Sequence, residues 1–396
     1  MSQGMQLFLC ARTGFERYQA FMSPDLMRKG WCPSLHAPMQ THDGWLVRVT
    51  PDPEGLSPEQ LAFLAEYAAR FGNARMTLTS RGNLQLRGLD EVSARDFPQL
   101  AAARGLGLAD PEAESRRRIL FVSPLAGKDS SCAPETLPLA RALEAALISF
   151  PPLWRPPEKF SLAVDGGGHL PVGALRADIA LRHDCGTWRL CHGPFSELLQ
   201  PHELISATVV LLKRLTASRG MPRALRSAPP FMAEVPPLMG QFLPGCHGVK
   251  AVLGEVSAAS CAGMARAGIS ARLTPWRGLI LDQPFEAPDL MHDPADPRRL
   301  AEACAGQGGC SRGQALTQRD ALSLVPDLGG RTLHVSGCVK GCAVRDTRDV
   351  TLVAQKDGYD LIWHGTTADR PVESGLGVED VRRRLRQNRH EGRTPP

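Results

Sequence analysis

Four cysteines in the last quarter of the chain have the number and spacing of iron–sulfur ligands. Cys304 and Cys310 are separated by five residues and Cys338 and Cys342 by three, with glycines around both pairs. Four thiolates from two loops can hold a tetrahedral zinc ion or a [4Fe–4S] cluster. Zinc sites favour two to four residues within each pair, so the wider first gap favours the cluster. The alternative, four small buried hydrophobic residues, suits a glycine-rich turn poorly.

A repeated strand, helix and strand gives the first indication of how these residues are positioned. The pattern occupies 44–89, with its second strand expected over 74–89, and returns near 246–283, where Leu273 corresponds to Leu78. In each copy a serine precedes the apolar helical spacing, as an N-cap does. We therefore expect two small related units.

A second, longer repeat pairs 177–193 with 348–365. Each copy is predicted to be a hairpin, because apolar residues alternate on both sides of a turn that contains glycine. A further strand is expected before each hairpin, at 159–166 and at 332–337. Small and larger units thus alternate along the chain, and a cleft between the two pseudo-symmetric halves is where we expect a ligand.

The second repeat separates the cluster cysteines from a pair with the same gap. Cys185 and Cys191 fall on the first hairpin, and the counterpart of Cys338 to Cys342 in the first copy is the cysteine-free segment 165–173. Only the second copy is therefore expected to hold a cluster. The remaining cysteines are expected to be unliganded thiols: Cys10, Cys32, Cys132, Cys246 and Cys261.

Further helices and the linkers follow from periodicity and proline content. Helices are expected at 135–150, 202–220, 319–325 and 377–389, and proline-dense linkers at 151–159, 228–240 and 283–297.

The composition is that of a multidomain globular protein, with 43% hydrophobic and 22% charged residues in 396. No apolar run is long enough to span a membrane, and the N-terminal residues lack the features of a signal peptide, so we expect a cytoplasmic protein. The odd count of 11 cysteines argues against a disulfide framework. Arginine greatly outnumbers lysine, which indicates either an anionic ligand or GC-rich coding. The arginine-rich segment 377–393 lacks interleaved aromatic residues, so nucleic-acid binding is not expected.

Several motifs together resemble the nitrite and sulfite reductase superfamily, over about 30–390. They are TLTSRGNLQLRGL at 77–89, RILFVSPLAG at 118–127, EKFSLAVDG at 158–166 and the two cysteine motifs. The resemblance implies an internally duplicated α+β fold with two ferredoxin-like half-domains, at 28–92 and 236–285. They would alternate with two larger reductase-like α+β domains, at 110–235 and 286–392, and the last would hold the 4Fe–4S cluster.

The segment 28–49 is similar to the opening of one subgroup, the O2-dependent monooxygenases of aerobic cobalamin synthesis. This implies conversion of the tetrapyrrole precorrin-3A into precorrin-3B: one oxygen atom enters a meso carbon with lactone formation, and the other is reduced to water. The electrons would come ultimately from NADH. No nicotinamide or flavin fingerprint is present, so we expect a separate reductase. A mononuclear non-haem iron is a further implied cofactor, for which His36 and His42 are candidate ligands.

The alternative is a sirohaem-dependent sulfite or nitrite reductase. Those enzymes place two lysines in a K-F-K arrangement, whereas this chain has Lys159, Phe160 and Ser161 there. It also has Thr77 and Gly82 where the reductases usually have arginine and glutamine. The loss of basic groups disfavours reduction of a small anion.

Basic residues at positions matching the superfamily are the candidates for binding the carboxylates of a tetrapyrrole. They are Arg48, Arg81, Arg87, Arg117, Arg118 and Lys159. Strand alternation would turn only one of Arg117 and Arg118 inward, and each of these residues is otherwise a surface charge. No general acid or base is assigned.

Overall fold

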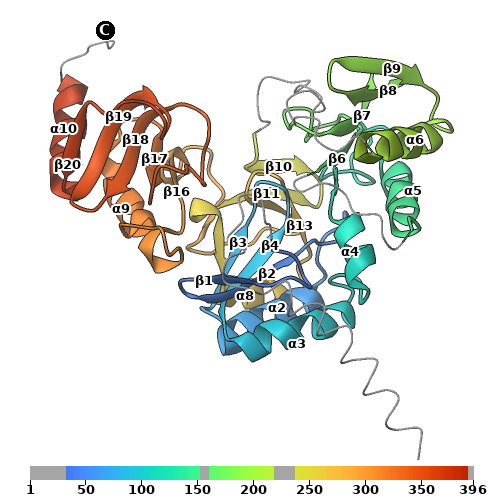
Figure 1. The fold of residues 1–396 in the computed structure, drawn as a ribbon, viewed down its shortest axis with the longest axis horizontal. Coiled ribbons are helices and arrows are strands. Elements are labelled where there is room, and N and C mark those ends of the chain that lie inside the picture. Colours follow the sequence, from blue (N-terminus) through green and yellow to red (C-terminus); the bar gives the residue numbers. More distant parts are fainter. Residues whose placement is uncertain (1–32, 152–159, 218–236, 391–396) are drawn as a thin grey trace, which may run out of the picture. The chain divides into compact units, whose positions relative to one another are not determined.

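The protein has a mixed α+β fold, as the sequence predicts. The structure is a computed structural model and describes residues 33–151, 160–217 and 237–390. Within these ranges the chain forms eight α-helices and four five-stranded sheets (Figure 1). The helices are α2 Pro58–Phe71, α3 Glu91–Ala102, α4 Pro111–Arg117, α5 Thr136–Ile148, α6 Leu204–Ala217, α8 Ala258–Arg266, α9 Thr317–Leu324 and α10 Val378–His390.

Two of the sheets belong to the two small units. The first small unit has the strand order β1-β2-β4-β3-β12, and the second has β10-β11-β14-β13 with β15 paired to β11. The strands of the first sheet are β1 Met39–Thr41, β2 Gly44–Val49, β4 Leu84–Leu89, β3 Arg75–Leu78 and β12 Glu255–Ser257. Those of the second are β10 Gly240–Leu243, β11 Cys246–Ala251, β14 Gly278–Leu281, β13 Ala271–Leu273 and β15 Leu290–Met291.

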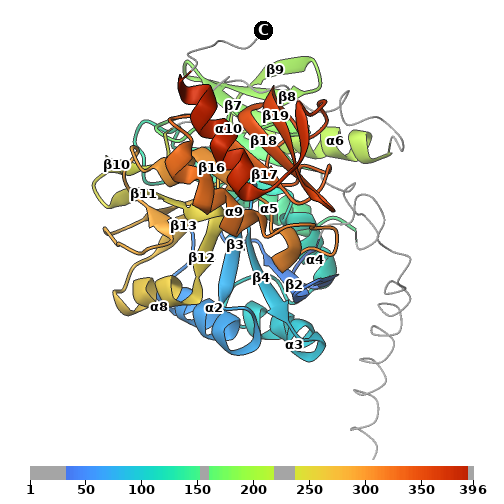
Figure 2. The ribbon, with the colours of Figure 1, turned by 90° about the vertical axis from the view of Figure 1, so that its left-hand side faces the viewer.

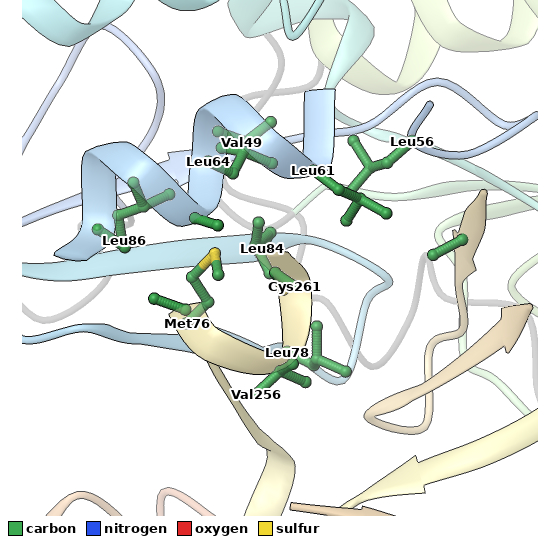
Figure 3. Close-up of a cluster of buried hydrophobic side chains, with 14 of the residues drawn as sticks. Val49, Leu56, Leu61, Leu64, Met76, Leu78, Leu84, Leu86, Val256 and Cys261 are labelled. Carbon is green, nitrogen blue, oxygen red and sulfur yellow. The ribbon is translucent and has the colours of Figure 1, made fainter. Parts of the chain in front are cut away.

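The two small units exchange short segments. Strand β12, which belongs to the second unit in sequence, pairs antiparallel with β3 of the first, with Val256 opposite Met76. In return Leu56 of the first unit forms a bridge with Ala271 in β13. One hydrophobic core therefore serves both units, and Figure 3 shows Val256 and Cys261 beside Met76 and Leu78.

The helices of the small units are specified locally and pack together. Ser57 caps α2 by accepting a hydrogen bond from the backbone N–H of Gln60, and the Gln60 side chain accepts from the backbone N–H of Ser57, which completes a capping box. One face of α2, including Leu61 and Leu64, is buried. Helices α2 and α8 lie side by side against the two sheets (Figures 1 and 2).

The prediction of a single strand over 74–89 was wrong, because the chain turns back between β3 and β4. The N–H of Thr79 donates to the carbonyl of Asn83 at 2.9 Å, and Gly82 takes the left-handed conformation with φ +66°. The same turn recurs between β13 and β14. There the N–H of Thr274 donates to the carbonyl of Gly278 at 2.9 Å.

The two larger units have sheets of the same topology. In β5-β6-β7-β8-β9 and in β16-β17-β18-β19-β20 the first two pairings are parallel and the last two antiparallel. The strands are β5 Leu120–Val122, β6 Leu162–Asp165, β7 Ile179–Asp184, β8 Thr187–His192 and β9 Phe195–Leu199 in the first larger unit. In the second they are β16 Ala301–Ala303, β17 Leu333–Ser336, β18 Arg348–Gln355, β19 Gly358–Gly365 and β20 Glu373–Leu376.

The second repeat extends to individual side chains. Asp178 accepts hydrogen bonds from the backbone N–H and the hydroxyl of Ser161, at 2.9 and 3.1 Å. Asp349 accepts the same pair from Thr332, at 2.8 and 2.7 Å. Both predicted hairpins are confirmed. Asp178 and Asp349 occupy corresponding positions in the two copies and make the same hydrogen bonds.

The remaining helices agree in part with expectation. The expected helices correspond to α5, α6, α9 and α10, although 218–220 lie outside the described residues. Helices α3 and α4 were not anticipated. Helix α3 contains Pro98, which weakens its pattern, and α4 has only seven residues. Within the described ranges no helix combines the length and the apolar character that a membrane span requires.

The duplicated aspartates provide a stability test with a built-in control. Asp178 is fully buried, whereas the Asp349 side chain is 38% exposed. We expect Asp178→Ala to lower the free energy of unfolding by about 3 kcal/mol, because it leaves two donors buried without an acceptor. Asp349→Ala should cost about 1 kcal/mol, because water replaces the lost acceptor. Urea unfolding of both variants measures the difference, and equal costs would contradict the buried role of Asp178.

Candidate cluster site and substrate cleft

The four cysteines predicted to hold the cluster follow two neighbouring parallel strands. Strand β16 pairs in parallel with β17, so the carboxyl ends of the two strands meet at one edge of the sheet. Cys304 follows β16 directly, and Cys338 follows β17 after Gly337. The backbone N–H of Gly337 donates to the sulfur of Cys304 at 3.1 Å. A hydrogen bond of this kind stabilises thiolate character.

Backbone hydrogen bonds close the first loop and join it to the second. The N–H of Cys310 donates to the carbonyl of Gly306 at 2.9 Å, and the N–H of Gly313 to the carbonyl of Cys310 at 2.9 Å. The N–H of Gln314 then reaches the carbonyl of Gly337 at 3.1 Å. The hydroxyl of Thr317, the first residue of α9, donates to the carbonyl of Cys304 at 2.6 Å.

Glycines in the first loop are required by close contacts. A Cβ atom at Gly313 would lie 2.2 Å from the backbone carbon of Gly306. Gly306 itself has φ +57°, and a Cβ there would lie 2.4 Å from the hydroxyl of Thr317. Gly308, in contrast, faces open space. The loop that carries Cys310 can therefore adopt this fold only with glycine at specific positions.

The four sulfurs are close enough to influence one another. Desolvation and the negative charges of Cys304, Cys338 and Cys310 raise the pKa of the Cys342 thiol, which Lys340 partly offsets. Cys342 is the exposed member of the set, and the other three are partly buried. A cationic centre would relieve the repulsion among four thiolates, and its binding would release protons.

The spacing of the cysteines in the sequence favours a cluster over a single zinc ion. The thiolates of a tetrahedral zinc site lie about 3.8 Å apart, since each Zn–S bond is about 2.3 Å. In the described part of the chain no three His, Cys, Asp or Glu side chains are placed to hold one ion. A cubane accepts four thiolates at wider separation, from loops of this kind. A [4Fe–4S] cluster on Cys304, Cys310, Cys338 and Cys342 stays the prediction made from their spacing.

In the first larger unit Cys185 and Cys191 lie on the first hairpin, where the repeat places them. Cys185 lies exposed in the β7–β8 turn, and Cys191 lies buried on β8, opposite Ala180. In the second copy Thr351 is opposite Ile362, the predicted counterpart of Cys191. Instead of cysteines, the loop after β6 contains His169, whose backbone N–H and ring Nδ1 lie 2.7 and 3.0 Å from Asp129.

A pocket lies at the junction of the first small unit, the first larger unit and the β13–β14 turn. The enclosed part of this pocket has a volume of only about 60 Å³, and the rest is open to solvent. Two predicted substrate-binding residues, Arg81 and Arg117, line it. The other lining residues are Thr50, Pro51, Asp52, Pro53, Gly82, Asn83, Leu120, Phe121, Val122, Pro124, Glu144, Leu273 and Pro275.

Arg117 is held firmly at this pocket. Its Nε donates to Glu144 at 2.8 Å, and its Nη1 to the carbonyl of Thr50 at 2.8 Å and to Glu114 at 3.4 Å. Burial raises the pKa of Glu114, and Arg117 partly counteracts this. The side chain of Arg117 is only 7% exposed. It is thus a pre-oriented donor whose charge is already partly neutralised.

The other predicted binding residues are not among those lining the pocket. Arg117 is the last residue of α4 and Arg118 is its C-cap, so strand alternation does not apply to them. The Nε atom of Arg118 is buried and has no hydrogen-bond partner among the described residues. Arg48 on β2 is positioned to donate to Gln85. Arg87 pairs with Asp43. Lys159 lies outside the described residues, as do Cys10 and Cys32.

The two candidate histidines are not brought together. His36 is bonded through Nε2 to the carbonyl of Leu108 at 2.7 Å, and burial lowers its pKa. His42 is exposed in the turn between β1 and β2. The structure therefore assembles no iron site from this pair.

Comparison with known proteins agrees with the fold. The nitrite/sulfite reductase ferredoxin-like half-domain model matches residues 38–101. The solved structure of the Mycobacterium tuberculosis NirA protein has a TM-score of 0.55 at 18% identity, covering 84% of this chain and 76% of that chain. The protein has the nitrite/sulfite reductase fold, and its relatives place it among redox enzymes of that superfamily.

Two curated relatives show which family within this superfamily the chain belongs to. A precorrin-3B synthase from a Sinorhizobium species is 34% identical over 424 residues, 92% of this chain and 91% of the relative. The chain therefore belongs to the precorrin-3B synthase family. A ferredoxin–nitrite reductase from Synechococcus elongatus is 33% identical over 133 residues, or 32% of this chain and 25% of that relative. This second match is partial, so the precorrin-3B synthase assignment is favoured over the reductase.

Two glycines of the first cysteine loop allow a matched test of the cluster site. We expect Gly313→Ala to lose most of the iron and acid-labile sulfide, because the added methyl group cannot fit against the backbone of Gly306. Gly308→Ala makes the same change five residues away in open space and should keep the full content. Iron and sulfide analysis of anaerobically purified protein measures both. Equal content in the two variants would show that the loop does not shape the site.

Proposed function

We propose that this protein is an O2-dependent monooxygenase that converts precorrin-3A into precorrin-3B. One atom of O2 enters the meso carbon between rings A and D with closure of a lactone. The other leaves as water, with two electrons derived from NADH and accompanying protons. The observation that carries this proposal is the similarity to a precorrin-3B synthase across nearly the whole of both chains.

The cofactor that we propose is a [4Fe–4S] cluster held by Cys304, Cys310, Cys338 and Cys342. When bound, such a cluster supplies single electrons, which no protein side chain of this site can deliver. A mononuclear iron remains part of the proposal without assigned ligands. We further propose that a separate reductase delivers the electrons.

The residues of the chain itself bind and orient the substrate. Precorrin-3A carries acetate and propionate groups, and guanidinium groups bind carboxylates in two-point fashion. Arg81 lies in the turn at the pocket, and Arg117 is fixed there by Glu144 and Thr50. These two residues would hold carboxylates of one edge of the ring system. Lys159 is a third candidate.

The position of Ser161 disfavours the reductase alternative. In the reductases this position has the second lysine of the K-F-K arrangement. Here Ser161 is fully buried and both its N–H and its hydroxyl are bonded to Asp178. It therefore presents no charge to a ligand, and the position has a structural role in this chain.

The proposed carboxylate contact predicts a specific kinetic effect. Arg81→Gln should lower kcat/KM for precorrin-3A by about 10- to 100-fold, the value of one lost charge-assisted hydrogen bond. Arg75→Gln is the control, because Arg75 lies on the neighbouring strand with a 63% exposed side chain paired to Glu255. Product formation under air with an excess of reductant measures both. Equal activity of the two variants would remove Arg81 from the binding site.

Absorption spectroscopy distinguishes the proposed function from the reductase. Protein purified anaerobically should show a broad iron–sulfur shoulder, about four sulfides per chain and no sharp haem bands. Sirohaem bands would assign the chain to sulfite or nitrite reduction, and zinc without sulfide would exclude both. Rapid reduction by NADH alone would contradict the separate electron donor.

A further inference from the structure

We propose that Arg87 and Arg277, one from each small unit, are positioning residues of the proposed cluster. Each would fix the backbone beside the second cysteine of one pair and place a positive charge near the cluster. The inference rests on the proposed cluster, but neither arginine belongs to the cysteine motifs.

Arg87 reaches the first cysteine loop from strand β4. Its Nη2 donates to the carbonyl of Gly309, the residue before Cys310. The guanidinium is held from the other side by Asp43, through Nε at 3.1 Å and Nη2 at 3.0 Å. Both side chains are largely buried, at 12% and 13% exposure. This geometry is a fixed bidentate pair that aims one donor at the loop.

The contact at Gly309 leaves no space for a side chain. A Cβ atom there would lie 2.7 Å from Nη2 of Arg87. The φ angle of Gly309 is −151°, outside the left-handed region. The close approach of the arginine therefore favours glycine at this position.

Arg277 reaches the second cysteine loop from the β13–β14 turn. Its Nη2 donates to the carbonyl of Ala343, the residue after Cys342, at 3.0 Å. Each arginine thus bonds a backbone carbonyl of a residue next to the later cysteine of a pair, before Cys310 in one case and after Cys342 in the other. Donors to these carbonyls fix the direction of the neighbouring Cys310 and Cys342 side chains.

The backbone conformation of Arg277 is unfavourable for a residue with a side chain, which indicates that the side chain has a role. Arg277 has φ +61°, a left-handed conformation that is unfavourable for residues other than glycine. The equivalent position in the first small unit is Gly82, with φ +66°. The equivalence follows from the matching turn bonds of Thr79 and Thr274. The second unit keeps an arginine where its copy has the unstrained glycine, and the structure shows that side chain at the cluster loop.

A nearby positive charge favours the reduced cluster, which carries one more negative charge than the oxidised form. Loss of either arginine should therefore shift the one-electron reduction equilibrium toward the oxidised cluster. The loss should also broaden or displace the electron paramagnetic resonance signal, because the cysteine beside the released carbonyl becomes less ordered. A merely structural contact would change stability without changing these two properties.

Arg277→Gly is the decisive variant. It removes the side chain but suits the left-handed backbone, so the unfolding midpoint should equal or exceed that of the wild type. The reduction equilibrium should nevertheless shift about tenfold toward the oxidised cluster, or about 59 mV for a one-electron couple. Arg87→Gln should give a shift in the same direction, and Arg87→Lys, which keeps the charge, should restore most of it. Dye-mediated titration followed by electron paramagnetic resonance measures the midpoints.

Arg75→Gln serves again as the control, and should leave both the midpoint and the signal of the full-length protein unchanged. Wild-type midpoints and signals in Arg277→Gly and Arg87→Gln would overturn the inference while leaving the proposed function in place. A wild-type chain that binds no iron and sulfide would overturn the two together. Iron and sulfide analysis of every sample separates these outcomes.

Discussion

Each small unit contributes a short segment to the other, and this exchange holds the two units around one hydrophobic core. Val256 completes the first sheet beside Met76, and Leu56 bridges to Ala271 in the second. Each unit covers part of its partner's exposed strand edge, and both share one core. The β3–β4 and β13–β14 turns are thereby fixed relative to each other. The β3–β4 turn places Arg81 at the pocket, and the β13–β14 turn directs Arg277 toward the second cysteine loop. The same repeated turn therefore has a different role in each small unit.

The larger units show how one topology supports two chemistries. Parallel pairing of the first two strands brings two loops to the same edge in each copy. In the second copy those loops carry four cysteines. In the first they are joined by Asp129, which accepts bonds from His169 and Ser131 and whose pKa these contacts hold at about 2 against the opposing effect of burial. The first copy thus closes its edge with an internal hydrogen-bond network and has one buried thiol there, Cys132, whereas the second copy carries four cysteines in its loops.

Much of this arrangement could be predicted from the sequence. Apolar periodicity identified both hairpins and most helices, because this signal is local. The cluster indicated by cysteine spacing stays a prediction. Arg87 was predicted to bind substrate because it matches a basic position of the superfamily. A basic residue on a strand gives no information about which distant group it contacts. Its bond to Gly309 joins segments that are remote in the chain. Arg277 was not identified from the sequence as a candidate site residue. The repeat aligns it with Gly82, and an arginine at a position where the other copy has glycine is a signal that can be read from the sequence. The turn of 79–83 was missed because Gly82 was treated as part of a strand.

The exchange between the small units also affects the order in which the protein can be made. Strand β12 lies after the whole first larger unit in sequence, so the first sheet lacks its last strand until that unit has left the ribosome. Contacts between such distant segments form late, because loop closure must precede them. During synthesis the edge of β3 remains unpaired and prone to wrong partners. The cysteine loops emerge only afterwards, so cluster insertion is expected to occur on a chain whose scaffold is already closed.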